Sequence, residues 1–191
     1  MVTFPESLES VSSGLVLAAL LALAQAVPSP IPLGHGASWE YRESYAEQHQ
    51  GIAAIEDATT RFRMHRTAKG GYYVNQKGGA DPGFGPVERG PDWIKLLPWT
   101  GEDALPLPLR EGAVGPGSSP DHAGWKVEAE EEVIVPAGTF KAWRCAIRSW
   151  TQESILWIVP GVGIVKETQG MPKRQPEIER VLLRWQAGGS E

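Results

Sequence analysis

Cysteine and histidine are scarce in this 191-residue chain, which has one cysteine and four histidines. A single cysteine cannot form a disulfide, a thiolate metal cluster or a redox pair within the chain. Cys145 lies in the apolar run of residues 143–147, which favours a buried thiol over a nucleophile. No two histidines stand two or four residues apart, so the spacing of a local metal site is missing. The histidines are His35, His49, His65 and His122.

Blocks of positive charge are missing as well. The formal charge is −5, and no cluster of Lys and Arg stands out. Proteins that bind nucleic acid need a concentrated basic surface, so we expect no nucleic-acid partner. No G-x-S-x-G elbow is present, and no glycine-rich loop leads into a predicted helix. We therefore expect no enzyme activity, no cofactor and no metal, and a hydrolase is the least favoured alternative.

Only one hydrophobic run is long enough to be a targeting segment. Residues 14–26 are rich in leucine and alanine and end in Ala24-Gln25-Ala26, the pattern of a signal-peptide core followed by a cleavage site. The residues before it include no Lys or Arg, which is atypical of a signal peptide. A transmembrane helix needs ~20 apolar residues, so no stable membrane span is expected. We predict a helical signal peptide at residues 1–26 and an exported chain, periplasmic or extracellular.

After this run the chain shows the two-residue alternation of β-strands and no helical periodicity. In residues 38–45, Trp39 and Tyr41 alternate with charged side chains, which predicts a strand with an aromatic face. Residues 61–67 alternate in the same way. Glycines then mark a turn before a returning strand at residues 72–74, so a β-hairpin is expected there.

The second half of the chain is built around residues 130–168, where three apolar runs are separated by two turns. Residues 155–159 are apolar on both faces, which is typical of a strand covered on two sides. The proline and glycine residues of the turns favour register-setting corners. The turns are Pro136-Ala137-Gly138 and Pro160-Gly161-Val162-Gly163.

For two strands of this half, the sequence predicts which side chains share a face of the sheet. In residues 125–135, Glu131 and Ile134 interrupt an otherwise regular alternation, as a β-bulge or a sheet edge would. The apolar face predicted for that strand consists of Val127, Ala129, Val133 and Val135. In the last strand, Arg180 and Arg184 are expected on one face. The face opposite them is predicted to hold Val181, Leu183 and Trp185.

These patterns predict a mainly β fold in one domain. Residues 27–37 are proline- and glycine-rich and read as a linker, and residues 38–187 form the predicted β domain. Within it, residues 77–120 are a glycine- and proline-rich excursion that we expect to add one or two edge strands. The predicted architecture is a curved antiparallel sheet in the form of a half-open barrel, with a β-sandwich as the alternative.

Three motifs resemble a pattern found in uncharacterised bacterial envelope proteins with a half-open β-barrel, which are related in fold to the lipoprotein carriers of the LolA/LolB-like class. The resemblance implies a curved antiparallel sheet with an apolar concavity, and it carries over no catalytic residue. The motifs are Gly36-x-x-Trp39-x-Tyr41, Val133-x-Val135-Pro136-Ala137-Gly138-Thr139-Phe140, and Trp157-x-x-Pro160-Gly161-Val162-Gly163-Ile164-Val165-Lys166.

The candidate ligand-binding residues are the large apolar side chains expected to point into the concave face. They are Trp39, Tyr41, Phe62, Met64, Trp143, Ile147, Trp157 and Trp185. If the sheet curls, these side chains converge and can hold an apolar or amphipathic, lipid-like molecule. The alternative is that they fill an ordinary core, and that the chain is a cell-envelope interaction or scaffold protein whose exposed edge at residues 125–135 binds a protein partner.

Overall fold

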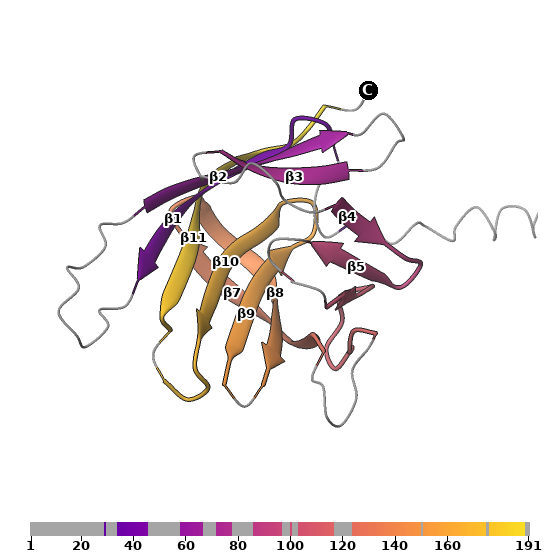
Figure 1. Cartoon of the computed structure of the whole chain (residues 1–191), viewed down its shortest axis with the longest axis vertical. Helices are drawn as coiled ribbons and strands as arrows, with labels where there is room; N and C mark the ends of the chain where they lie inside the picture. The colour runs from indigo at the N-terminus through magenta and orange to yellow at the C-terminus, as the bar shows by residue number, and fades with distance from the viewer. Residues whose placement is uncertain are drawn as a thin grey trace, which may run out of the picture.

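The computed structural model describes residues 29, 34–45, 58–66, 72–77, 86–96, 100, 103–116, 124–149, 151–174 and 176–189. The predicted signal peptide and most of the predicted linker lie outside these ranges, as do His49 and His122. The described residues form β-strands and connecting turns without a helix, which confirms the mainly β prediction (Figure 1). Accordingly, none of the described segments is a helix with the length and apolar character needed to cross a membrane.

Eleven strands are present in the described residues. They are β1 (Ser38–Tyr45), β2 (Ala58–Arg66), β3 (Tyr72–Lys77), β4 (Pro86–Arg89), β5 (Trp93–Leu96), β6 (Leu105–Pro106), β7 (Lys126–Val135), β8 (Gly138–Arg148), β9 (Glu153–Val159), β10 (Gly163–Gly170) and β11 (Ile178–Gln186). The predicted strand at residues 38–45 and the hairpin of residues 61–74 are confirmed, because β2 and β3 pair in antiparallel register.

The strands form one antiparallel sheet in the order β6-β5-β4-β3-β2-β1-β11-β10-β9-β8-β7. Every pair of neighbours in this order is also adjacent in sequence except β1 and β11, which join the first and last strands at the centre of the sheet. The predicted curved antiparallel sheet is therefore observed, rather than the two separate sheets of a β-sandwich (Figure 1). The predicted excursion at residues 77–120 contributes three short strands, β4, β5 and β6, which continue the sheet beyond β3.

The sheet is not a closed barrel, because its end strands β6 and β7 do not pair with each other. The segment that follows β6 forms backbone hydrogen bonds only with the start of β7. There Val127 N donates to Ala113 O at 2.9 Å, and Gly115 N donates to the carbonyl of Trp125 at 2.7 Å. This close approach requires glycine, because a Cβ on Gly115 would lie 2.0 Å from the carbonyl oxygen of Ala104.

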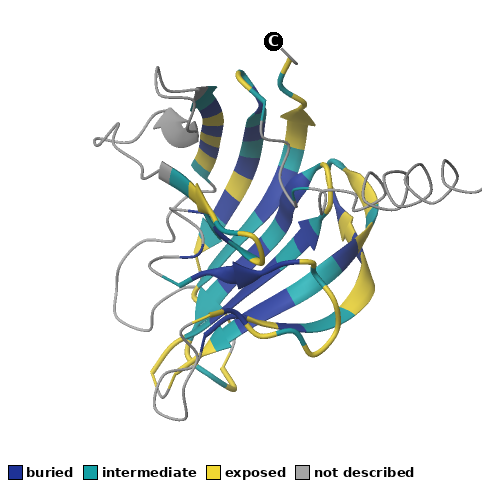
Figure 2. Ribbon diagram, turned by 90° about the vertical axis from the view of Figure 1, so that its right-hand side faces the viewer, coloured by how far each residue is buried: buried dark blue, intermediate teal, exposed yellow. Residues whose placement is uncertain are grey.

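The core is continuous across the sheet (Figure 2). Ile94 and Leu96 of β5 are buried in the same cluster as Leu156 and Ile158 of β9. Strand β9 lies between β8 and β10, and its adjacent residues Ile155 and Leu156 are both buried. On the face of Leu156 the strand is fully covered, whereas on the other face Ile155 is buried and Trp157 is half-buried, so the prediction that both faces are covered holds in part.

A bulge in β7 changes the predicted faces of that strand. Val127 pairs with Cys145, whereas Ala129 pairs with the adjacent residue Arg144, so Glu128 is an extra residue. Directly opposed residues lie on the same face of a sheet, and successive residues of β8 point to opposite faces. Val127 and Ala129 therefore lie on opposite faces. The prediction that they share one was wrong, because an inserted residue reverses the alternation.

A second irregularity separates the two arginines of β11. Arg184 pairs with Glu40 and Arg180 pairs with Glu43, while Leu183 is skipped in the register with β1. Because Glu40 and Glu43 are three residues apart on a regular strand, they point to opposite faces, and their arginine partners do the same. The prediction that Arg180 and Arg184 share a face was wrong. Arg180 is instead directed into the core, and Arg184 is directed to solvent.

Candidate functional site

The four predicted site residues of β1 and β2 do meet, but they meet as core side chains. Trp39, Tyr41, Phe62 and Met64 are between 0% and 3% exposed. Trp39 and Phe62 are directly opposed in the sheet, and the rings of Tyr41 and Phe62 pack edge to face with centroids 5.6 Å apart. Such aromatic pairs stabilise a core beyond the area that they bury.

The polar atoms of these aromatic side chains are bonded to the backbone at the far side of the core. Trp39 Nε1 donates to the carbonyl of Val162, and the Tyr41 hydroxyl donates to the carbonyl of Ile164, each at 2.7 Å. Burial raises the pKa of Tyr41 well above its usual value, so the phenol keeps the proton that it donates. Because their hydrogen-bonding capacity is used and their surface is covered, these residues fill the core and stabilise the turn between β9 and β10.

The predicted residues of β8 and β9 do not share one face. Trp143 pairs with Ile158, and Arg144 pairs with Trp157. Trp143 and Ile147 are two residues on either side of Cys145 and point to the face that is buried at Ile158, whereas Trp157 lies on the opposite face with Arg144. The expectation that Trp157 points inward with Trp143 was wrong, because β9 is apolar on both faces and its sequence carries no alternation to orient it.

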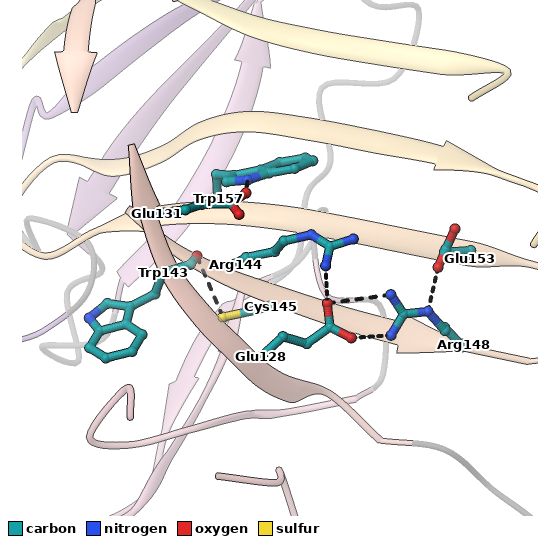
Figure 3. A network of polar contacts seen from close by, with 8 residues as sticks. All are labelled: Glu128, Glu131, Trp143, Arg144, Cys145, Arg148, Glu153 and Trp157. Atoms are coloured by element: carbon teal, nitrogen blue, oxygen red, sulfur yellow. Dashed lines mark hydrogen bonds and ion pairs between the residues drawn. The ribbon is translucent and has the colours of Figure 1, made fainter. Parts of the chain in front are cut away.

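Trp157 lies instead within a network of charged side chains on the outer face (Figure 3). The Nζ of Lys166 is 5.3 Å from the indole centroid, the guanidinium of Arg144 is 6.0 Å away, and Nε1 donates to Glu131 at 2.5 Å. Cations at such distances are attracted by the aromatic face. The remaining ion pairs of the network join Glu128 to Arg144 and Arg148, and Arg148 to Glu153. The positive and negative charges of the network balance each other. We interpret it as a set of surface ion pairs.

Trp185, the last of the predicted ligand-binding residues, lines a pocket. It is 37% exposed and lines a depression of about 670 Å³ where the paired ends of β1, β2 and β11 meet. Trp39 and Phe62 also line this pocket, although they are almost completely buried. Three of the eight predicted ligand-binding residues are thus brought together at a cavity, and the other five do not line it.

Three arginines and one glutamate line the same pocket, which we name the arginine pocket after Arg61, Arg63, Arg184 and Glu40. Glu40 is directly opposite both Arg61 and Arg184, and Arg63 lies two residues from Arg61 on the same strand. All four side chains are therefore on one face of the sheet. Their three positive charges and one negative charge leave a local charge of +2 in a chain whose formal charge is −5.

Glu40 organises this charge through one oxygen. Its Oε2 accepts hydrogen bonds from Arg61 Nε at 2.6 Å, from Arg184 Nη2 at 2.7 Å and from Arg184 Nε at 3.0 Å. These bonds lower the pKa of Glu40, so it is ionised at neutral pH. The guanidinium groups are accessible, since the side chains of Arg61 and Arg184 are 52% and 71% exposed.

The alternation of residues 61–67 puts Arg61 and Arg63 on one face of a strand but does not indicate what lies beside them. Nothing in the sequence indicated that Arg184 lies beside them, because β1 brings β2 and β11 together across most of the chain. Pairings of such long range leave no local pattern.

A separate cluster of ionised side chains lies inside the sheet. Arg180 donates through Nε to Glu43 at 2.9 Å and through Nη1 to Glu167 at 2.8 Å. Thr60 donates to Glu43 at 3.0 Å, and Gln169 donates to Glu167 at 2.5 Å. Burial raises the pKa of Glu167, whereas hydrogen bonds from Arg180 and neighbouring groups outweigh burial and lower the pKa of Glu43.

This buried cluster joins β1, β2, β10 and β11, and its carboxylates have hydrogen-bonding partners. It contains no metal-binding arrangement, and no group of three metal-ligating side chains occurs elsewhere in the described residues. We interpret it as a structural clamp.

Cys145 is expected to be unreactive in the folded protein. It is fully buried, and burial, with a smaller effect of Glu128, raises the pKa of its thiol to about 12. Because the thiolate is the reactive form, reaction with a disulfide reagent at pH 8 should be at least on the order of a thousandfold slower than for an exposed thiol. A cysteine introduced at the exposed position Thr151 is the control and should react at once. Rapid labelling of Cys145 without denaturant would contradict this assignment.

No protein-family model matches the chain, and no curated protein sequence matches it significantly. Two solved structures are similar to it. One, from Parabacteroides distasonis, is provisionally named a lipoprotein: it has a TM-score of 0.53 and 14% identity over 85% of this chain and 100% of its own. The other is from Bacteroides fragilis and is provisionally named an exported protein with a YmcC-like fold. Its TM-score is 0.48, with 14% identity over 82% of this chain and 98% of its own. At 14% identity the first comparison shows a common fold alone, and the relation to LolA/LolB-like carriers stays a prediction.

Proposed function

We propose that this chain is an exported, non-catalytic protein that binds an amphipathic, lipid-like molecule in the arginine pocket. The sequence of residues 1–26 supports export, because it combines a short apolar core with a small-residue cleavage site. A structure with the same fold carries a lipoprotein name, which fits a location in the cell envelope. Among the described residues no group of three metal-ligating side chains occurs, and burial raises the pKa of the Cys145 thiol to about 12.

The observation that carries this proposal is a pocket at the ends of β1, β2 and β11, where accessible arginines line one face of the sheet and Trp185 lies on the other face, opposite Trp39. The pocket of about 670 Å³ falls within the range of ~300–1,000 Å³ that is typical of small-molecule sites. Trp185 offers an apolar contact, and Arg61 and Arg184 offer charged donors at the surface. The inward side chains of β1 and β2, by contrast, are covered by the core. The proposed site therefore lies at the ends of the central strands, where the inward side chains Trp39 and Phe62 are buried.

Tryptophan fluorescence tests this proposal with twelve-carbon amphiphiles of different headgroups, each below its micelle concentration. We expect saturable binding that Trp185→Ala weakens by about tenfold, because a partly buried aromatic anchor is removed. Trp143→Phe is the control, since Trp143 lies on the core face of β8 and does not line the pocket. No saturable binding of any amphiphile, or equal binding by the Trp185 variant, would contradict the proposal.

A second function, binding of a protein partner at the sheet edge, is favoured by Ile134. This residue is 77% exposed on β7, the terminal strand of the sheet. Charges on the same strand, at Glu130 and Glu132, would restrict pairing to a complementary partner. Ile134→Lys should remove a specific partner from a pull-down of envelope fractions. An unchanged set of partners would argue against this alternative.

A further inference from the structure

The arginine pocket has far more hydrogen-bond donors than its own carboxylate can satisfy. Each guanidinium carries five N–H donors. Arg61 uses only its Nε on Glu40, and Arg184 uses Nε and Nη2 on the same oxygen. Within the described part of the chain, no carboxylate forms an ion pair with Arg63. Most of the N–H groups of the three arginines therefore remain available to a ligand.

The geometry of these donors favours a compact group with several oxygens. Arg61 and Arg184 are fixed on either side of Glu40, one from β2 and one from β11, and Arg63 adds a third guanidinium from β2. A carboxylate presents two oxygens in one plane, and a single arginine satisfies them bidentately. A phosphate monoester presents three free oxygens in a tetrahedral arrangement and can bind several guanidinium groups at once.

Charge points to the same group. The pocket has a residual charge of +2 once Glu40 is counted. A phosphate monoester carries a charge between about −1.5 and −2 at pH 7, which neutralises this excess, whereas a carboxylate neutralises half of it. A zwitterionic or uncharged headgroup would leave the arginines without compensation.

We propose that the arginine pocket recognises a phosphate monoester group, and that Glu40, which accepts hydrogen bonds from Arg61 and Arg184 on one oxygen, offsets part of their positive charge until the ligand binds. This inference rests on the proposed function and specifies its ligand: an amphiphile whose phosphate contacts the arginines and whose apolar part extends past the ends of the strands to Trp185, which lies on the opposite face of the sheet. Arg63, which has no ion-pair partner among the described residues, is the principal phosphate ligand.

Calorimetric titration of the full-length protein tests this assignment with dodecyl phosphate, dodecanoate, dodecyl maltoside and inorganic phosphate. We expect dodecyl phosphate to bind at least about tenfold more tightly than dodecanoate, because more charge-assisted hydrogen bonds form. Arg63→Gln should lower the affinity for dodecyl phosphate about tenfold. The variant should then bind dodecyl phosphate and dodecanoate equally well. Arg110→Gln is the matched control, since Arg110 is exposed and does not line the pocket.

Glu40→Gln gives a second test that works in the opposite direction. Removing this negative charge should strengthen binding of dodecyl phosphate by about fivefold at low salt, whereas a purely structural Glu40 would weaken it or leave it unchanged. The preference for phosphate over carboxylate should persist in this variant, because the arginines are retained.

The outcomes separate this inference from the proposed function. Equal affinity for all headgroups, with sensitivity to Trp185→Ala, would overturn the phosphate assignment and leave amphiphile binding intact. Binding of inorganic phosphate as tight as that of dodecyl phosphate would support the assignment and identify a free phosphate compound as the ligand, which overturns the lipid-like function. No binding by any of the four compounds would overturn both.

Discussion

Replacing Arg180 by methionine is expected to lower the free energy of unfolding by ~3–5 kcal/mol, the usual cost of removing one partner from a buried ion pair. Arg180 is the cation that pairs with both Glu43 and Glu167, whose side chains are only 7% and 1% exposed. Methionine matches much of the volume but leaves two carboxylates in the core without a counter-charge. Urea unfolding followed by tryptophan fluorescence measures the change.

The loss should depend on pH in a defined direction. In the wild-type protein the folded-state pKa of Glu43 is lowered, so its contribution to stability is present above its unfolded-state pKa and is lost as the pH falls. The folded-state pKa of Glu167 is raised, so its contribution is present at low pH and is lost as the pH rises. Without Arg180 both folded-state pKa values should rise. The loss of unfolding free energy caused by Arg180→Met should therefore be larger at pH 8 than at pH 4.

Arg184→Met is the matched control for this prediction. Arg184 is on the same strand and also pairs with a glutamate, but its side chain is 71% exposed. Exposed ion pairs contribute ~0–1 kcal/mol, so the control should unfold near the wild-type midpoint. If the two variants were equally stable, or if the Arg180 deficit did not change with pH, the clamp would not be the source of stability that we infer.

Replacing Trp39 by alanine should cost ~3–5 kcal/mol of unfolding free energy, as large-to-small substitutions of core aromatic residues do. Trp39 is 2% exposed, packs opposite Phe62 and donates through Nε1 to the carbonyl of Val162. Trp39→Phe keeps most of the volume and removes that hydrogen bond, so it should cost ~1–3 kcal/mol. Denaturant unfolding of the two variants separates the packing contribution from the hydrogen-bond contribution.

Trp185→Ala is the control, because Trp185 is 37% exposed and should contribute about 1 kcal/mol or less. The comparison also tests the original interpretation of the sequence. A Trp39→Ala variant with wild-type stability that had lost only ligand binding would mean that Trp39 is a ligand contact, as the sequence first indicated, and not a core residue.

Local patterns were sufficient to predict most strands. The alternation of residues 38–45 and the apolar run of residues 155–159 each correspond to a strand of the sheet, β1 and β9. Both patterns report on how one segment is covered, which is a local property. The number of strands in the excursion at residues 77–120 was underestimated. One or two were expected and three are present, because β4, β5 and β6 are too short to show an alternation.

The predictions that failed depend on single inserted residues and on pairing between strands that are far apart in the sequence. Glu128 and Leu183 each shift the register of a strand, and nothing in their residue types distinguishes them from their neighbours. Each shift reverses the faces of the residues that follow. For this reason the sequence predicted one outward face for Arg180 and Arg184, where the structure has a buried clamp on one side and a pocket on the other.

The pairing of β1 with β11 also constrains when the fold can be completed. Trp39 and Tyr41 find their hydrogen-bond acceptors 123 residues later in the chain, and their strand has its second neighbour only when β11 is available. During synthesis, the core of the N-terminal half therefore cannot close until the C-terminal strand is present. Folds dominated by such contacts form slowly, since the entropy of closing the long loop is lost before the contacts form. A chain with this topology therefore stays incompletely folded until its last strand, β11, is available.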